Sequence, residues 1–115
     1  MIMVELPWPP SINNYYRRNG SRYFITSKGI EFRMHTALAC LNYRNEFDKD
    51  ARLSVTIYAY PPDNRRRDLD NINKCLLDSL EKAQVFVDDS QIDELIMRRL
   101  KPNDGKVIVN IKRCN

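Results

Sequence analysis

The sequence predicts a small α+β domain in which two helices cover one face of a small mixed β-sheet. Two hydrophobic patterns alternate along the 115 residues, short stretches with a period of two and longer stretches with a helical period. Their order is β-α-β-α-β-β, and no helix separates the last two strands. A chain of this length forms one domain with a modest core, so we expect a single domain over residues 1–115.

The first strand is expected over residues 2–6, where apolar side chains alternate with others before Pro7 ends the run. Residues 7–26, PWPPSINNYYRRNGSRYFIT, then look like a long connection rich in proline, asparagine and glycine. A connection this long inside a small domain is usually functional or disordered. Tyrosines and arginines are interleaved in this one, which favours a function.

The first helix is expected over about 28–45, with Ser27 as its N-cap. Its apolar positions follow the i, i+4, i+7, i+8, i+11 pattern of one buried face. These positions are Ile30, Met34, Ala37, Leu38 and Leu41. The second strand is expected over residues 52–60, because apolar and polar side chains alternate there until two prolines follow.

The second helix is expected over about 71–83, with one apolar stripe that faces the core. The stripe consists of Ile72, Cys75, Leu76, Ser79, Leu80 and Ala83. A third strand is expected over about 92–100, and a fourth begins after Gly105. The sequence PNDG suits a hairpin turn between these two strands.

Composition describes an ordinary globular protein with a basic balance. The net charge is +4, and a symmetric dimer would carry twice that, +8, which favours a polyanionic partner. The three cysteines are far apart and form no CxxC pair, so we expect free thiols in a reducing cytosol and no zinc cluster. No signal peptide, membrane partner or small-molecule cofactor is expected.

The most densely charged stretch of the chain is RRRDLDNINK, residues 65–74. Asp68 and Asp70 are two residues apart, so both carboxylates point to one side if the segment is extended. Asp88 and Asp89 follow the second helix, and a short crossover could return one of them to the beginning of that helix. Three carboxylates would then be gathered in one place.

Three neighbouring carboxylates repel one another unless a cation neutralises them, and Mg²⁺ prefers such oxygen ligands. In phosphodiester hydrolysis Mg²⁺ activates water and stabilises charge on the phosphate oxygens. Lys74, one helical turn after Asp70, could position the nucleophile or offset negative charge. The alternative is that Asp70 caps the helix and the other charges are solvated, and the spacing fits this equally well.

Three blocks of the sequence together resemble the RusA endodeoxyribonucleases, which resolve Holliday junctions in bacteria and lambdoid prophages. The blocks are LPWPPSINNYYRRNGSRYFITSKGIEFR, RRRDLDNINK and KAQVFVDDSQID, and they extend over nearly the whole chain. Their order and spacing make the resemblance specific. It implies a homodimeric nuclease that uses Mg²⁺, which Mn²⁺ could replace, to nick two opposed strands of a four-way DNA junction.

By position, the resemblance implies catalytic roles for Asp68, Asp70, Asp89 and Lys74, with the three aspartates as metal ligands. Asp88 matches the neighbouring acidic position and ranks below Asp89 as a ligand. The arginines that precede the family motif are matched here by three residues that would hold DNA phosphates, Arg65, Arg66 and Arg67.

The N-terminal connection is expected to touch DNA or to flank the active site, because polar and aromatic side chains are concentrated there. The residues in question are Asn13, Asn14, Tyr15, Tyr16 and Arg17. The alternative is that the tyrosines pack on the first helix or in a dimer interface.

Two other functions fit the sequence. A non-catalytic nucleic-acid-binding module would use the aspartates only to cap the helix and orient the arginines. A nuclease of the same chemistry could instead act on flaps, replication forks or RNA.

Overall fold

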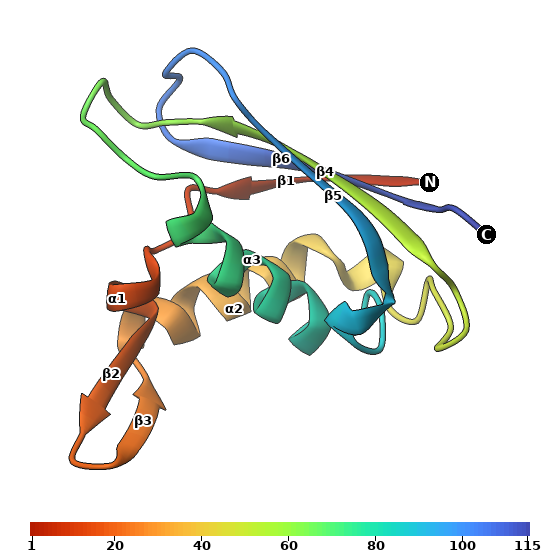
Figure 1. Ribbon diagram of the computed structural model, residues 1–115, viewed down its shortest axis with the longest axis horizontal. Helices are drawn as coiled ribbons and strands as arrows, with labels where there is room; N and C mark the ends of the chain where they lie inside the picture. Colours follow the sequence, from red (N-terminus) through yellow and green to blue (C-terminus); the bar gives the residue numbers. More distant parts are fainter.

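The computed structural model describes all 115 residues and contains a four-stranded mixed sheet with two long helices packed on one face (Figure 1). The sheet has the strand order β1-β6-β4-β5. The strands are β1 (Ile2–Pro7), β4 (Leu53–Tyr60), β5 (Ile92–Arg99) and β6 (Lys106–Arg113), and the long helices are α2 (Ser27–Ala39) and α3 (Asp70–Lys82). The predicted α+β class and mixed sheet are confirmed. The two long helices have 13 residues each, and no helix has the length and apolar character that crossing a membrane requires.

The core lies between the sheet and the two long helices. In β4 the side chains of Val55, Ile57 and Ala59 are fully buried beneath the helices, while those between them face the open side of the sheet. The predicted stripe of α3 is confirmed, because all six of its residues are buried. Alternation in β4 and helical periodicity in α3 therefore identified the two central elements correctly.

The expected hairpin between the last two strands is absent, because β4 lies between β5 and β6. β4 pairs in parallel with β5 and antiparallel with β6, so the connection over residues 100–105 passes the end of β4. Asp104 and Gly105 still form a tight turn, with φ of 58° and 77°. The turn residues were identified correctly, but β6, the strand after the turn, pairs with β4 and not with β5. As a result, β5 is an edge strand.

The predicted core face of the first helix is wrong. The stripe of apolar residues is exposed, to 50% at Ile30, 63% at Met34 and 68% at Leu38. The opposite face, with Gly29 and Phe32, packs inwards instead. The helix also ends at Ala39, well before residue 45, and Thr26 rather than Ser27 is its N-cap. The Thr26 hydroxyl accepts a hydrogen bond of 3.1 Å from the backbone N–H of Gly29.

Gly29 explains which face of α2 is buried. A Cβ atom at this position would lie 2.7 Å from Cδ1 of Tyr15 and 3.0 Å from its carbonyl oxygen. Only a residue without a side chain allows the helix backbone to approach Tyr15 so closely. This contact fixes α2 against the N-terminal connection.

The N-terminal connection is itself folded, which the sequence did not indicate. It contains the short helix α1 (Ile12–Tyr15) and the two strands of a hairpin, β2 (Tyr16–Asn19) and β3 (Arg22–Ile25). The hairpin projects away from the main sheet (Figure 1). Gly20 forms its turn with a φ of 66°.

Replacing Gly29 with alanine is expected to lower the free energy of unfolding by about 1–2 kcal/mol. Overpacking of this kind costs about 1–3 kcal/mol, which exceeds the roughly 1 kcal/mol that alanine gains over glycine in a helix. Chemical denaturation measures the change, with Lys28→Ala, exposed in the same helical turn, as the control. A Gly29→Ala protein more stable than the wild type would contradict the close contact with Tyr15.

Candidate active site

The segment that leads into α3 holds the predicted arginines and aspartates in a defined arrangement. Nη1 of Arg67 donates a hydrogen bond of 2.6 Å to Oδ1 of Asp63. This bond, followed by one from the backbone N–H of Arg65, lowers the pKa of Asp63 to about 2. The guanidinium of Arg99 donates to the carbonyl oxygen of Arg67, which ties the segment to the end of β5.

Asp68 and Asp70 lie at the beginning of α3, and both are exposed. Asp70 is the first residue of the helix, while Leu69 occupies the N-cap position and provides no side-chain cap. The prediction that Asp70 caps the helix is therefore wrong. A carboxylate in the first turn still interacts favourably with the positive end of the helix dipole.

A groove with a volume of about 590 Å³ lies beside these residues. One wall is formed by the segment before α3 and its first turn, including Arg66, Arg67 and Asp68. The other wall is formed by the chain after β1, from Trp8 to Asn14. Three predicted DNA-binding residues, Asn14, Arg66 and Arg67, thus meet a predicted metal ligand in one concave surface.

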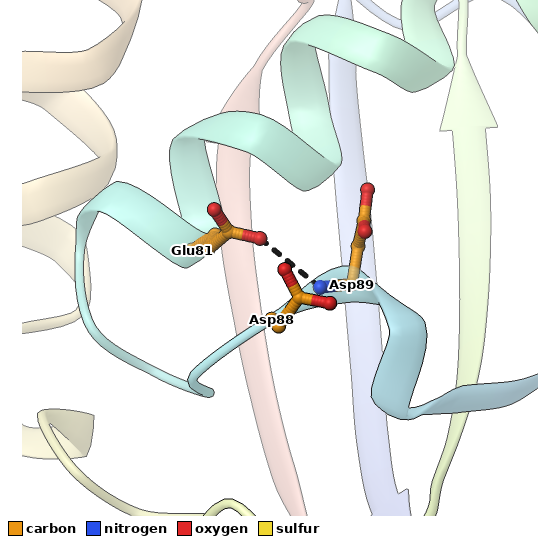
Figure 2. A group of neighbouring side chains, drawn as sticks. All are labelled: Glu81, Asp88 and Asp89. Atoms are coloured by element: carbon orange, nitrogen blue, oxygen red, sulfur yellow. Dashed lines mark hydrogen bonds between the residues drawn. The ribbon is translucent and has the colours of Figure 1, made fainter.

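Asp89 lies at the other end of α3, in a carboxylate cluster with Glu81 and Asp88 (Figure 2). One carboxylate oxygen from each of the three residues lies within 4.8 Å of the others. The backbone N–H of Asp89 donates a hydrogen bond of 3.0 Å to Oε1 of Glu81. We refer to Glu81, Asp88 and Asp89 as the carboxylate cluster.

The turn that carries the cluster is well fixed. It is the 3-10 helix η2 (Asp89–Gln91), and the Asp88 carboxylate caps it by accepting from the backbone N–H of Ser90 at 2.9 Å. Hydrogen bonds from Ser90 lower the pKa of Asp88. Gln91 is buried and anchors the turn through its side chain to the carbonyl oxygens of Asp48 and Ala51.

The expected gathering of Asp68, Asp70 and Asp89 does not occur within one chain. Asp70 begins α3 and the carboxylate cluster lies at its far end, and a helix of 13 residues is roughly 18 Å long. The connection from α3 to Asp88 folds back at the end of the helix, where the backbone N–H of Val85 donates to the carbonyl oxygen of Leu80, so Asp89 stays beside Glu81. Glu81 was not predicted as a site residue. Its spacing could have indicated it, because Glu81 follows Asp70 by about three helical turns and so lies on the same face of α3.

Among the other predicted residues, Lys74 is exposed one turn after Asp70. Asn13, Arg17 and Arg65 are exposed as well, and Tyr16 is half-buried. All of them remain accessible to a nucleic acid.

The structure removes Tyr15 from the predicted DNA contacts, because its side chain is fully buried. Its hydroxyl donates to the carboxylate of Asp78 and accepts a hydrogen bond of 2.8 Å from Nε of Arg33. Arg33 also donates to Asp78 at 2.6 Å. Burial raises the pKa of Asp78, but the hydrogen bonds from Tyr15 and Arg33 outweigh this and lower it overall. Tyr15 thus packs against the first long helix, α2, which was the alternative to a DNA contact.

The donor chemistry of both ends of α3 fits a hard divalent cation. Asp68 and Asp70 at one end, and the carboxylate cluster at the other, offer only carboxylate oxygens, and the aspartates are exposed. Carboxylates of this kind bind Mg²⁺ or Mn²⁺ and leave other coordination positions to water or to phosphate oxygens.

Comparison with known proteins gives a consistent result. The family model described as Endodeoxyribonuclease RusA matches residues 7–112. A crossover junction endodeoxyribonuclease rusA of Enterobacteria phage HK97 is 41% identical over 107 residues, which cover 92% of this chain and 89% of that protein. A crossover junction endodeoxyribonuclease RusA of Escherichia coli K12 is 38% identical over 89 residues, 77% of this chain and 74% of that protein.

Proposed function

Since the chain belongs to the RusA endodeoxyribonuclease family, we propose that it is a metal-dependent endonuclease that resolves Holliday junctions by paired, symmetric nicks during DNA recombination and repair. The whole chain, residues 1–115, would act as one endonuclease domain. The groove at the beginning of α3 carries the proposal most directly. It places the carboxylate of Asp68 beside Arg66 and Arg67, so that an acidic and a basic group face the same space.

In this groove the arginines would hold the DNA backbone. Arg66 is exposed, and the planar guanidinium suits two parallel hydrogen bonds to a phosphate. Arg67 is oriented by Asp63 and therefore presents a fixed direction to the groove. Asn14 on the opposite wall can donate to the same backbone. Three further residues would extend this surface, Asn13 in α1 and Tyr16 and Arg17 in β2.

We infer that Asp68, Asp70 and Asp89 are the metal ligands and that Mg²⁺, or Mn²⁺ in its place, is the metal. Because Asp70 and Asp89 lie at opposite ends of α3, Asp89 would come from the second copy of a homodimer. A divalent cation supplies an activated water and stabilises negative charge on the phosphate under attack. The exposed ammonium group of Lys74, one turn from Asp70, would offset the charge of the pentavalent transition state.

A homodimer explains the paired nicks. A twofold particle offers two identical sites to the two opposed strands of a four-way junction, which is itself nearly twofold symmetric. It also doubles the net charge from +4 to +8, which strengthens attraction to DNA phosphates.

Competition among branched and linear DNA tests the proposal. Wild-type protein with Mg²⁺ is given a four-way junction, a flap, a fork and a linear duplex of equal length. We expect the junction to be cut preferentially, and removal of the metal by a chelator to stop cleavage. Preferred cutting of flaps or forks would assign the chemistry to another substrate, and binding without any cleavage would indicate a non-catalytic module.

Arg66→Ala is expected to weaken junction binding and to reduce the slope of log affinity against log salt concentration by about 0.9, the value for one lost phosphate contact. Titrations at several salt concentrations measure the slope. Lys112→Ala is the matched control, since it removes the same charge from an exposed position on β6, outside the groove. Equal slopes for Arg66→Ala and the wild type would exclude Arg66 as a phosphate contact.

A further inference from the structure

The hairpin of β2 and β3 projects from the body of the protein and has a composition of its own (Figure 1). Residues 16–25 contain three arginines, three aromatic residues and no acidic residue. Basic and aromatic side chains that are interleaved in this way are typical of surfaces that bind nucleic acids. A two-stranded hairpin is at best marginally stable alone, so its order depends on what holds its base.

The base of the hairpin is fixed to the core, whereas its outer part is free. Tyr16 and Ile25, which pair with each other at the base, are half-buried and pack against the core. The backbone N–H of Thr26 donates a hydrogen bond of 3.0 Å to the carbonyl oxygen of Tyr15. Every residue from 17 to 24 is exposed. The hairpin thus presents these residues to a partner on a fixed support.

One face of the hairpin is already satisfied by contacts within the chain. Arg18 lies directly opposite Tyr23, and its guanidinium is 5.7 Å from the centre of that ring. Nε of Arg18 also donates a hydrogen bond of 2.7 Å to the carbonyl oxygen of Gly20. This face therefore holds an internal cation–π pair.

The opposite face of the hairpin has no such internal contacts. Arg17 lies directly opposite Phe24, and Arg22 precedes Phe24 by two residues and so shares its face. The ring of Phe24 is 49% exposed and does not pack against the core. The exposed side chains of Arg17 and Arg22 form no hydrogen bond or salt bridge within the chain. An apolar ring between two unpaired guanidinium groups fits a nucleotide strand, which offers an aromatic base between two phosphates.

We propose that Phe24 stacks on an unstacked base at the branch point of the junction, while Arg17 and Arg22 bind the phosphates on either side of that base. This inference rests on the proposed function and adds to it a site that recognises the branch.

A stacking ring distinguishes a branch from a linear duplex. Inside a duplex each base is stacked on both faces, and inserting a ring costs a few kcal/mol of lost base stacking. At a branch point the strands exchange partners and the stack is interrupted, so a base is exposed there at lower cost. Arginines that bind phosphates contact both kinds of DNA, whereas the ring of Phe24 would favour the junction.

The hairpin is close enough to the groove for both to contact one DNA strand. Asn14, which lines the groove, precedes Arg17 by three residues. Three residues span at most about 10 Å, which corresponds to about three nucleotides of a DNA strand at about 3.4 Å each. A base stacked on Phe24 would therefore lie a few nucleotides from the phosphate under attack.

The exposed stripe on α2 is the other large apolar surface of the chain. It contains no aromatic ring and no arginine, so it fits neither base stacking nor phosphate binding.

Equilibrium binding without metal tests the stacking contact separately from cleavage. Phe24→Ala should weaken binding to a four-way junction about tenfold, as expected for one lost stacking contact, and change binding to a linear duplex by less than about twofold. Tyr23→Ala is the matched control, because it removes a ring that is 69% exposed on the opposite face of the same hairpin. It should leave the ratio of junction to duplex affinity unchanged.

Two results of these titrations would overturn the inference. If Phe24→Ala keeps the junction affinity of the wild type, the exposed face of the hairpin belongs to another partner. If it weakens junction and duplex binding equally, Phe24 does not recognise the branch.

Two further variants separate stacking from the burial of apolar surface. Phe24→Trp keeps an aromatic face and should bind the junction at least as tightly as the wild type. Phe24→Leu keeps an apolar side chain without a ring, and should lose as much junction affinity as Phe24→Ala. Circular dichroism checks that each variant is folded. Wild-type affinity in Phe24→Leu would contradict stacking.

A fluorescent base reports the unstacking directly. 2-Aminopurine, whose emission rises when it leaves the stack, is placed in turn at the positions next to the branch point and, as a control, in the middle of one arm. Wild-type protein without metal should raise the emission only at the branch, and Phe24→Ala should abolish this rise. A rise that persists in Phe24→Ala would contradict the role of Phe24. If the wild type binds the junction but never cuts it with Mg²⁺, the proposed nuclease function fails, while the affinities and the emission still decide the stacking contact.

Discussion

Asp70→Asn is expected to slow Mg²⁺-dependent junction cleavage by about 100-fold or more, because a ligand to a catalytic metal contributes several kcal/mol to transition-state stabilisation. The amide has the size of the carboxylate but lacks its charge. Asp70 is exposed in the first turn of α3, so the free energy of unfolding should change by less than about 0.5 kcal/mol. Junction affinity, measured without metal, should be retained.

The matched control for this variant is Asp50→Asn, which removes the same charge from an exposed position outside the groove. Single-turnover cleavage of a labelled junction gives the rates of all three proteins. Cleavage by Asp70→Asn at the wild-type rate would mean that Asp70 is not a ligand. If Asp70→Asn lost junction binding together with cleavage, Asp70 would instead be a DNA contact.

Asp78→Ala is expected to lower the free energy of unfolding by about 2–4 kcal/mol, because it leaves the guanidinium of Arg33 and the buried hydroxyl of Tyr15 without their acceptor. The side chains of Arg33 and Asp78 are only 24% and 14% exposed, so water compensates poorly for the lost carboxylate. Tyr15→Phe is the matched control. It removes the hydroxyl, which donates to Asp78 and accepts from Arg33, but it keeps the ring and the Arg33–Asp78 ion pair, and should cost about 1 kcal/mol.

The effect of Asp78→Ala should also depend on pH. The pKa of Asp78 is lower in the folded chain than its ordinary value of 3.8, so ionised Asp78 stabilises the fold above that value. This contribution is lost as pH falls through the folded pKa. The difference in unfolding free energy between wild type and Asp78→Ala should therefore shrink below pH 3.8. A constant difference from pH 7 to pH 2 would contradict the ionised state of Asp78.

The central elements of the fold could be predicted from the sequence because the hydrophobic pattern of each is compatible with only one buried face. Alternation in β4 and the stripe of α3 each mark a single buried face, and both are confirmed. α2 shows why a pattern can mislead. The stripe from Ile30 to Leu41 has the period of a core face, but the close approach at Gly29 buries the opposite side.

Strand order was harder to predict than strand position. The turn at Asp104 and Gly105 was recognised, yet turn chemistry does not determine whether β6 pairs with β5 or passes it to reach β4. That choice depends on long-range pairing of β6 with both β1 and β4. It also decides that β5 is an edge strand.

Part of the candidate site could likewise be predicted from the sequence, and part of it could not. Residues close in sequence, such as Arg66, Arg67 and Asp68, do share a groove, because a short segment positions all of them. The second wall of the groove and the position of Asp89 depend on tertiary structure, so sequence spacing could not give them. The distance between the two ends of α3 became visible only in the folded chain, and it is the reason for proposing a site shared by two copies.

The most direct test of the proposed function is strand-specific mapping of cleavage on a four-way junction. Each of the four strands is labelled in turn, wild-type protein is bound without metal, and Mg²⁺ starts the reaction. We expect nicks at symmetric positions in two opposed strands, which yield two nicked duplexes. Nicks scattered over all four strands, or an uncut junction that remains bound after Mg²⁺ is added, would contradict it.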